Sequence, residues 1–153
     1  MLIERANIND AEAIARFQVA MAKESENTIL ATNLVTRGVT EALNDKNKGM
    51  YLVARNDEGL PVASLMITRE WSDWRCTWYW WIQSVYVRPE YRRRGIYKAM
   101  YNKVKAMAKD ENVLHINLYV DRENKAAIST YQSLGMTDSH YLMYEEHTAP
   151  ENG

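Results

Sequence analysis

A run of strand-forming residues, followed by a helical pattern and then a second apolar run, sets the main constraint on the fold. Residues 77–87, TWYWWIQSVYV, are rich in aromatic and β-branched side chains, and Pro89 ends the run. Apolar residues then recur at helical spacing from Ile96 to Met107, and the apolar segment VLHINLYV at 113–120 follows. A strand, a helix and a strand in this order predict a right-handed parallel crossover.

The rest of the chain continues the alternation of strands and helices. Asn9 followed by Glu12 resembles a capping box, so a helix should begin there and end near Glu24 or Ser25. The fold class expected is α/β (mixed α+β), with a mixed central sheet of six to seven strands and about four helices. A single domain should span residues 1–147, with a flexible tail at 148–153. The further expected elements are a strand at 2–6, a helix through Val35, Val39 and Leu43, a hairpin at 50–71, a helix at 123–135 and a last strand at 140–146.

The overall charge argues against a protein built to bind nucleic acid. The chain has 19 Lys and Arg against 20 Asp and Glu, a formal net charge of -1, whereas proteins that neutralise many phosphates are usually basic. Basic residues are nevertheless concentrated between Arg88 and Lys109. We expect one local basic surface and no nucleic-acid partner; an RNA-binding module is the alternative that the arginine run suggests.

Neither a membrane segment nor a metal site is expected. The first residues, MLIERANIND, do not form a signal peptide, and no window has the roughly 20 apolar residues of a membrane span. We therefore expect no membrane partner and a cytoplasmic protein. Cys76 is the lone cysteine and has no neighbouring histidine, and the three histidines have no metal-like spacing with it.

The arginine-rich turn between the strand and the helix could bind phosphate. Pro89 ends the strand, Gly95 relaxes the backbone, and the helix that follows presents unpaired N–H groups at its partly positive end. The flanking arginines suit phosphate oxygens. A solvated basic surface has the same pattern and is the alternative.

Two motifs resemble those of the GNAT superfamily of N-acetyltransferases. The stretch VYVRPEYRRRGIYKAM is similar to the family's acetyl-CoA signature, although Tyr97 stands where a small residue is usual. The stretch NKAAISTYQSLGM is similar to a later motif of the family. The matching residues are Val85, Val87, Arg92 and Gly95 in the first motif, and Asn124, Ala127, Tyr131 and Gly135 in the second.

The resemblance implies a fold, a co-substrate and a binding site. It implies a sheet that splays after the SVYV segment, and acetyl-CoA as co-substrate without a metal. Pantetheine would hydrogen-bond to the backbone at Val85 and Val87, and the pyrophosphate would lie on the amides of residues 93–98. The residues implied to bind acetyl-CoA are Val85, Tyr86, Val87, Arg92, Arg93, Arg94, Gly95, Ile96, Tyr97, Lys98, Asn124, Ala127 and Tyr131.

Acetyl transfer to an amine needs a neutral amine and a proton for the departing thiolate. The resemblance places Tyr131 beside the thioester sulfur, and a phenol with an ordinary pKa of about 10 can act there as the proton donor. Many relatives carry a glutamate before the V-x-V segment, but this chain has Gln83 and Ser84 there. The candidates for the base are Glu70 and either Glu24 or Glu26, acting through water or holding an ammonium group.

All five tryptophans fall between Trp71 and Trp81. At strand spacing Trp78 and Trp80 share one face while Trp81 points to the other, which fits core packing or a wall around a cationic group. The residues expected to bind the acceptor are Glu26, Trp71, Trp74 and Gln83.

The acceptor expected is a primary amine of a small molecule, attacked directly in a ternary complex. The chain loosely resembles the diamine and polyamine branch of the superfamily; an amino acid, an aminoglycoside or a protein lysine are the other acceptors considered. A non-catalytic acyl-CoA-binding or sensing domain is the alternative to an enzyme. The aromatic content and the resemblance are compatible with a homodimer.

Overall fold

The structure is a computed structural model, and it describes residues 1–150. The chain divides into two compact units, Met1–Tyr119 and the segment from Val120 onward. Each unit is described by itself. The three last residues of the tail expected at 148–153 lie outside the described residues.

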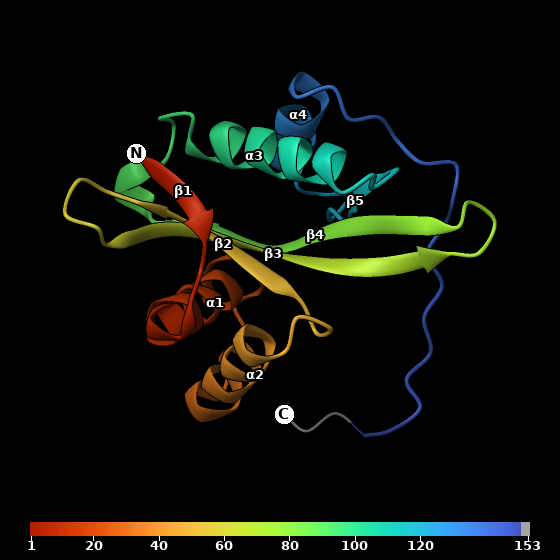
Figure 1. Cartoon of the computed structure of the whole chain (residues 1–153). Coiled ribbons are helices and arrows are strands. Elements are labelled where there is room, and N and C mark those ends of the chain that lie inside the picture. The colour runs from red at the N-terminus through yellow and green to blue at the C-terminus, as the bar shows by residue number, and fades with distance from the viewer. Residues whose placement is uncertain (151–153) are drawn as a thin grey trace. The chain divides into compact units, whose positions relative to one another are not determined.

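The first unit is built around a five-stranded sheet with strands in the order of the sequence (Figure 1). The first four strands pair antiparallel and β4 pairs parallel with β5. The α3 helix connects β4 to β5, so the predicted parallel crossover unit is confirmed. The strands are β1 (Leu2–Arg5), β2 (Met50–Arg55), β3 (Pro61–Ser72), β4 (Thr77–Val87) and β5 (Ile116–Leu118).

The expectation of six to seven strands is wrong. Residues 140–146 form no strand, and β5 is shorter than the apolar run at 113–120 from which it was predicted. Tyr141 and Tyr144 remain 76% and 90% exposed. A strand exists only where its backbone joins a ladder, so a β-rich composition alone overestimated the sheet.

Residues 1–150 contain four α-helices, as predicted. They are α1 (Ala11–Glu26), α2 (Thr32–Asn44), α3 (Ile96–Asp110) and, in the second unit, α4 (Lys125–Ser133). A short 3-10 turn, Ile8–Asp10, precedes α1. The capping box lies two residues earlier than predicted, because Asn7 and Asp10 rather than Asn9 and Glu12 exchange the two hydrogen bonds.

Helices cover both faces of the sheet. Figure 1 shows α1 and α2 on one face of the sheet and α3 on the other. The first layer buries Ile14 and Val39 against Val53, and the buried residues of α3 include Met100 and Val104. The far end of the β3–β4 hairpin extends beyond these helices (Figure 1).

A nearly buried ion-pair network links the start of α1 to β1 and β2. Both guanidinium NH groups of Arg55 donate to the Asp10 carboxylate at 2.8 Å, and its Nε donates to Glu4 Oε1 at 2.6 Å. The side chains of Arg55 and Asp10 are 12% and 6% exposed. The Asp10 and Glu4 hydrogen bonds raise the pKa of Arg55, which therefore stays charged.

The helices of residues 1–150 include none with the length and apolar character of a membrane-spanning segment.

Candidate active site

Strand β4 pairs with β3 at both of its ends but with β5 over only three residues. Its β5 neighbour pairs with residues 80–82 alone, while β3 pairs with it from Thr77 to Val87. The segment Gln83–Val87 therefore leaves one backbone edge without β5, and this is the predicted splay. An open strand edge offers N–H and C=O groups to an extended ligand.

A β-bulge lies at the point where the sheet splays. The register with β3 jumps so that Ser84 and Val85 have no partner on that strand within the described residues, and Ser84 adopts a left-handed φ of 55°. Gln18, a nearly buried residue of α1, donates from Nε2 to the Ser84 carbonyl at 3.4 Å. Bulges are typical of positions beside active sites, where they redirect backbone groups.

The turn after β4 leads directly into the N-terminal end of α3. Pro89–Tyr91 forms a 3-10 turn, and Gly95 is the N-cap residue of α3 with φ 75°, a left-handed conformation that glycine adopts readily. The first hydrogen bond of the helix runs from Ala99 N–H to the Gly95 carbonyl at 3.0 Å. The amides before Ala99 therefore point out of the partly positive end of the helix.

The space in front of this turn is open. A Cβ atom built on Gly95 would meet nothing within 4 Å. The Tyr97 hydroxyl is buried and its ring lies 6.3 Å from that of Tyr101, so the large side chain that departs from the usual small residue packs inward. Ile96 is buried and Lys98 is exposed at the same helix end.

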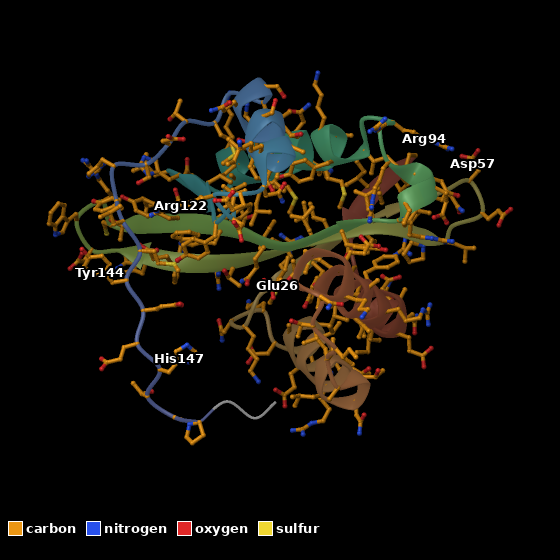
Figure 2. The ribbon with its side chains drawn as sticks, turned by 180° about the vertical axis from the view of Figure 1, so that it is seen from behind. Glu26, Asp57, Arg94, Arg122, Tyr144 and His147 are labelled. Atoms are coloured by element: carbon orange, nitrogen blue, oxygen red, sulfur yellow. The ribbon has the colours of Figure 1, made fainter. Side chains whose placement is uncertain are left out.

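Two of the three consecutive arginines remain available for an anion. Among residues 1–150 neither Arg93 nor Arg94 forms an ion pair with a carboxylate; Arg94 lies over the ring of Tyr91 at 5.2 Å. Figure 2 shows Arg94 and Asp57 at the same end of the sheet, where the β2–β3 turn meets the segment before α3. An open strand edge, exposed amides and two available guanidiniums fit the pantetheine and phosphates of CoA.

Arg92 is held differently from its two neighbours. Its Nε donates to the Val87 carbonyl and its NH2 group donates to Glu24 Oε2, each at 2.8 Å. The Tyr86 hydroxyl donates to the other Glu24 oxygen at 3.3 Å. Burial, together with the Glu24 carboxylate, raises the pKa of Tyr86, whose ring also stacks on Phe17 at 5.2 Å. Glu24 therefore links α1 to the turn at residues 88–95, here called the phosphate turn.

This arrangement gives a test of the role expected for Glu24. We expect Glu24→Gln to leave kcat and its pH profile unchanged, because the carboxylate is engaged with Arg92. Both side chains are 43% exposed, so the free energy of unfolding should fall by less than about 1 kcal/mol. Steady-state rates between pH 6 and 9 and urea denaturation measure the two effects. A loss of about 100-fold or more in kcat would instead identify Glu24 as the base.

Glu70 and Gln83 lie on the same face of the β3–β4 hairpin. The cross-strand register places Glu70 opposite Tyr79, Thr68 opposite Trp81 and Met66 opposite Gln83. The Trp81 Nε1–H donates to Glu70 Oε1 at 2.8 Å, and Gln83 Nε2 donates to Thr68 Oγ1 at 3.0 Å. Trp81 thus points away from Trp78 and Trp80, as predicted.

Of the other residues expected to bind the acceptor, the two tryptophans do not lie with Gln83, whereas Glu26 is on the side of the sheet that Gln83 faces. Trp71 is on the opposite face, in an edge-to-face contact with Trp78 at 4.9 Å, and Trp74 lies in the hairpin turn and is 90% exposed. Glu26 is the last residue of α1, on the side of the sheet that α1 and α2 cover (Figure 2).

The second unit contains the residues of the later motif. Asn124 is the N-cap of α4, and its Oδ1 accepts from the Ala127 amide at 3.1 Å. Tyr131 lies within α4, and its carbonyl accepts from Met136 N–H at 3.1 Å. Gly135, with φ 94°, supplies the left-handed residue after the helix. The helix predicted at 123–135 is confirmed with slightly closer bounds.

In the first unit, Gln18 and Tyr119 contact β4, although the sequence patterns did not single them out. Gln18 is a polar residue on the buried side of α1, beside Phe17, and that position was a usable signal. The pairing of Trp81 with Glu70 could not be predicted from the sequence, because it depends on the register between β3 and β4.

No group of three or more His, Cys, Asp or Glu that could hold a metal ion occurs in the described part of the chain.

Comparison with known proteins identifies the family. The model of the acetyltransferase (GNAT) family matches residues 13–136. The crystal structure of a possible acetyltransferase from Clostridium difficile 630 is 43% identical, with a TM-score of 0.92 over 97% of this chain and 98% of that chain. The ribosomal-protein-alanine N-acetyltransferase from Brucella melitensis biovar Abortus 2308 is 17% identical, with a TM-score of 0.79 over 96% of this chain and 99% of that chain, and shows the fold alone.

A curated relative matches a shorter segment. The thialysine N-epsilon-acetyltransferase from Bos taurus is 36% identical over 58 residues, which are 38% of this chain and 34% of that protein. The match therefore spans about a third of the length of that relative. The family model covers most of the chain, and the splayed β4 edge beside the phosphate turn fits the same family. The chain belongs to the acetyltransferase (GNAT) family of enzymes, whose members use acetyl-CoA.

Proposed function

We propose that the protein transfers the acetyl group of acetyl-CoA to a primary amine of a small molecule, by direct attack in a ternary complex. The observation that carries this proposal is the splayed β4 edge, Gln83–Val87, which runs directly into the turn and the N-terminal end of α3. Acetyl-CoA supplies the activated acyl group as a thioester. Cys76 lies in the β3–β4 turn and is exposed, and a covalent acyl-enzyme is not part of the proposal.

The binding roles follow from the geometry of the first unit. The backbone edge of Val85 and Val87 would hold the pantetheine, although Arg92 already donates to the Val87 carbonyl. The amides before Ala99 would hold the pyrophosphate, and Arg93 and Arg94 would take the remaining phosphate charge. These contacts would hold the thioester near the bulge at Ser84, where an amine that approaches along the strand could attack it.

The chemical roles concern the attacking amine and the departing sulfur. An alkyl amine with a pKa near 10.4 costs roughly 4–5 kcal/mol to deprotonate at pH 7, so attack needs a base or a site that favours the neutral amine. Gln83 cannot supply the base, and Glu24 is engaged with Arg92. Glu70 accepts the Trp81 indole N–H, so the proposal relies on a site that favours the neutral amine and names no carboxylate as the base. Tyr131 would donate the proton to the departing sulfur.

Calorimetric titration with acetyl-CoA and with acetyl-CoA lacking the 3′-phosphate tests this function. We expect loss of that phosphate to weaken binding about 10- to 100-fold, because a charge-assisted hydrogen bond contributes about 1.5–3 kcal/mol. The double variant Arg93→Ala/Arg94→Ala should bind acetyl-CoA with a similar loss and should no longer distinguish the two ligands.

The matched control is Arg37→Ala, which removes an exposed arginine from α2. This variant should keep the wild-type affinity and the preference for the 3′-phosphate. Release of thiol should then be screened against small primary amines, and initial rates should give intersecting lines for a ternary complex. Absence of acetyl-CoA binding, or binding without thiol release for any amine, would contradict the proposed function; the second result would favour an acyl-CoA-binding domain.

A further inference from the structure

An aromatic and acidic surface lies on the β3–β4–β5 sheet beyond the helices. It consists of side chains that share one face through the strand registers, next to the bulge but outside the phosphate turn. Trp81 packs on Tyr119 with ring centroids 4.6 Å apart, and Tyr79 stacks on His115 at 4.8 Å. The members of this surface, here called the Glu70 surface, are Glu70, Tyr79, Trp81, His115 and Tyr119.

The Glu70 carboxylate is the charged group of this surface. Its Oε1 accepts the Trp81 indole N–H at 2.8 Å, which fixes the orientation of an exposed side chain. No lysine, arginine or histidine of residues 1–150 forms an ion pair with it. The neighbouring Arg69 points to the other face, where its guanidinium lies 4.6 Å from the Trp78 ring centroid.

A fixed carboxylate without a cation, surrounded by aromatic rings, matches the chemistry that binds an ammonium group. Carboxylate oxygens accept charge-assisted hydrogen bonds from ammonium, and tryptophan and tyrosine faces attract cations. Between Trp81 and the bulge the same face carries Gln83, which is neutral and already bonded to Thr68. At about 3.3 Å per residue, Trp81 and Ser84 are about 10 Å apart along β4.

We propose that Glu70, oriented by Trp81, anchors a second positively charged group of the acceptor, at a distance along β4 from the amine that is acetylated. The proposal rests on the proposed function, because it assumes that the reacting amine lies at the bulge. It makes Trp81 a positioning residue, which acts through Glu70. It also gives Glu70 a role in acceptor selection instead of proton removal.

The test compares a diamine with a monoamine of the same carbon chain, diaminoheptane and heptylamine, because an extended seven-carbon diamine is about as long as the separation along β4. For the wild type, kcat/KM should favour the diamine about 10-fold or more. Glu70→Gln should raise KM for the diamine by a similar factor, leave its kcat unchanged, and leave both constants for heptylamine unchanged. Trp81→Phe keeps a ring but removes the N–H donor, so KM for the diamine should rise in the same sense.

Trp78→Phe is the control, because this residue lies on the opposite face against Trp71 and Arg69; it should preserve the preference for the diamine. Equal use of diamine and monoamine by the wild type, or a fall in kcat for both amines in Glu70→Gln, would overturn the anchor. If Trp81→Phe keeps the wild-type preference for the diamine over the monoamine, Trp81 does not position Glu70.

Direct binding separates failure of this inference from failure of the proposed function. Diaminoheptane should bind the wild-type protein in the presence of CoA, as measured by calorimetry, and should bind Glu70→Gln at least about 10-fold more weakly. If no amine is acetylated but this difference is found, the cation site stands and the proposed transfer reaction fails. If amines are acetylated and the difference is absent, the transfer reaction stands and the cation site fails.

Discussion

Replacement of Tyr131 by Phe is expected to lower kcat by about 10²- to 10⁴-fold while KM for acetyl-CoA stays close to that of the wild type. The range is that of a positioned general acid, because the substitution removes only the hydroxyl that would protonate the departing sulfur. The ring and the helix position remain, so the packing of α4 should be preserved. Steady-state rates and calorimetric binding of acetyl-CoA measure the two quantities.

The control for this substitution is Tyr144→Phe in the same unit. Tyr144 is 90% exposed and lies outside α4, so loss of its hydroxyl should leave kcat unchanged. An unchanged kcat in Tyr131→Phe would show that water or another group protonates the sulfur. A fall in kcat accompanied by loss of acetyl-CoA binding would indicate that Tyr131 positions the co-substrate.

The largest stability effect is expected for Asp10→Ala. This substitution leaves the nearly buried Arg55 guanidinium without the carboxylate that both of its NH groups contact. Breaking a buried pair by removing one partner costs about 3–5 kcal/mol, and the remaining bond to Glu4 favours the lower end of that range. The substitution also removes the Asp10 bond to the Asn7 amide at the start of α1. Urea denaturation at pH 7 measures the loss.

The same network predicts how stability depends on pH. Burial alone would raise the pKa of Asp10, but hydrogen bonds from Arg55 and from the Asn7 amide, with the Arg55 charge, lower it below the ordinary value of 3.8. The stabilisation from Asp10 is therefore fully present above pH 3.8 and is lost as the pH falls through the lower pKa of the folded state. Asp10→Ala should lack this acid-dependent loss.

Glu12→Gln is the matched control for Asp10→Ala. Glu12 forms a 4.0 Å ion pair with Arg16 on the exposed side of α1, and its loss should cost less than about 0.5 kcal/mol. Each single change, Asp10→Ala or Arg55→Met, leaves the other member of the ion pair charged and unpaired. The double variant removes both charges, so it should lose less stability than the two single changes added together. A loss below about 1 kcal/mol for Asp10→Ala would refute the role of the network.

Local patterns predicted those parts of the fold that local interactions determine. Strand β4 has the bounds expected from the run at 77–87, because β-rich composition and the following Pro89 coincide with the real ends of the ladder. The α3 helix, Ile96–Asp110, contains the whole run from Ile96 to Met107 in which apolar residues recur at helical spacing. The phosphate turn could be predicted because its ingredients, a strand end, a glycine and a helix start, are consecutive in the chain.

Features that depend on pairing between distant segments could not be predicted. The composition of residues 140–146 favours a strand, but no composition specifies whether a partner edge is present, and the segment joins no strand. The separation of Trp71 from Gln83 follows from the pleat and the register of the hairpin. Likewise, the ion pair that engages Glu24 joins residues 68 positions apart.

The bulge at Ser84 makes strand β4 sensitive to length in a way that ordinary substitutions do not reveal. Side chains alternate between the two faces with a period of two, and the extra residue returns Tyr86 to the face that carries Gln83 and Trp81. A deletion of one residue here would turn Tyr86 away from Phe17 and Glu24, and so detach the phosphate turn from α1. Strand β4 should therefore tolerate substitutions of its side chains, whereas an insertion or deletion within it would disrupt the contacts of Tyr86.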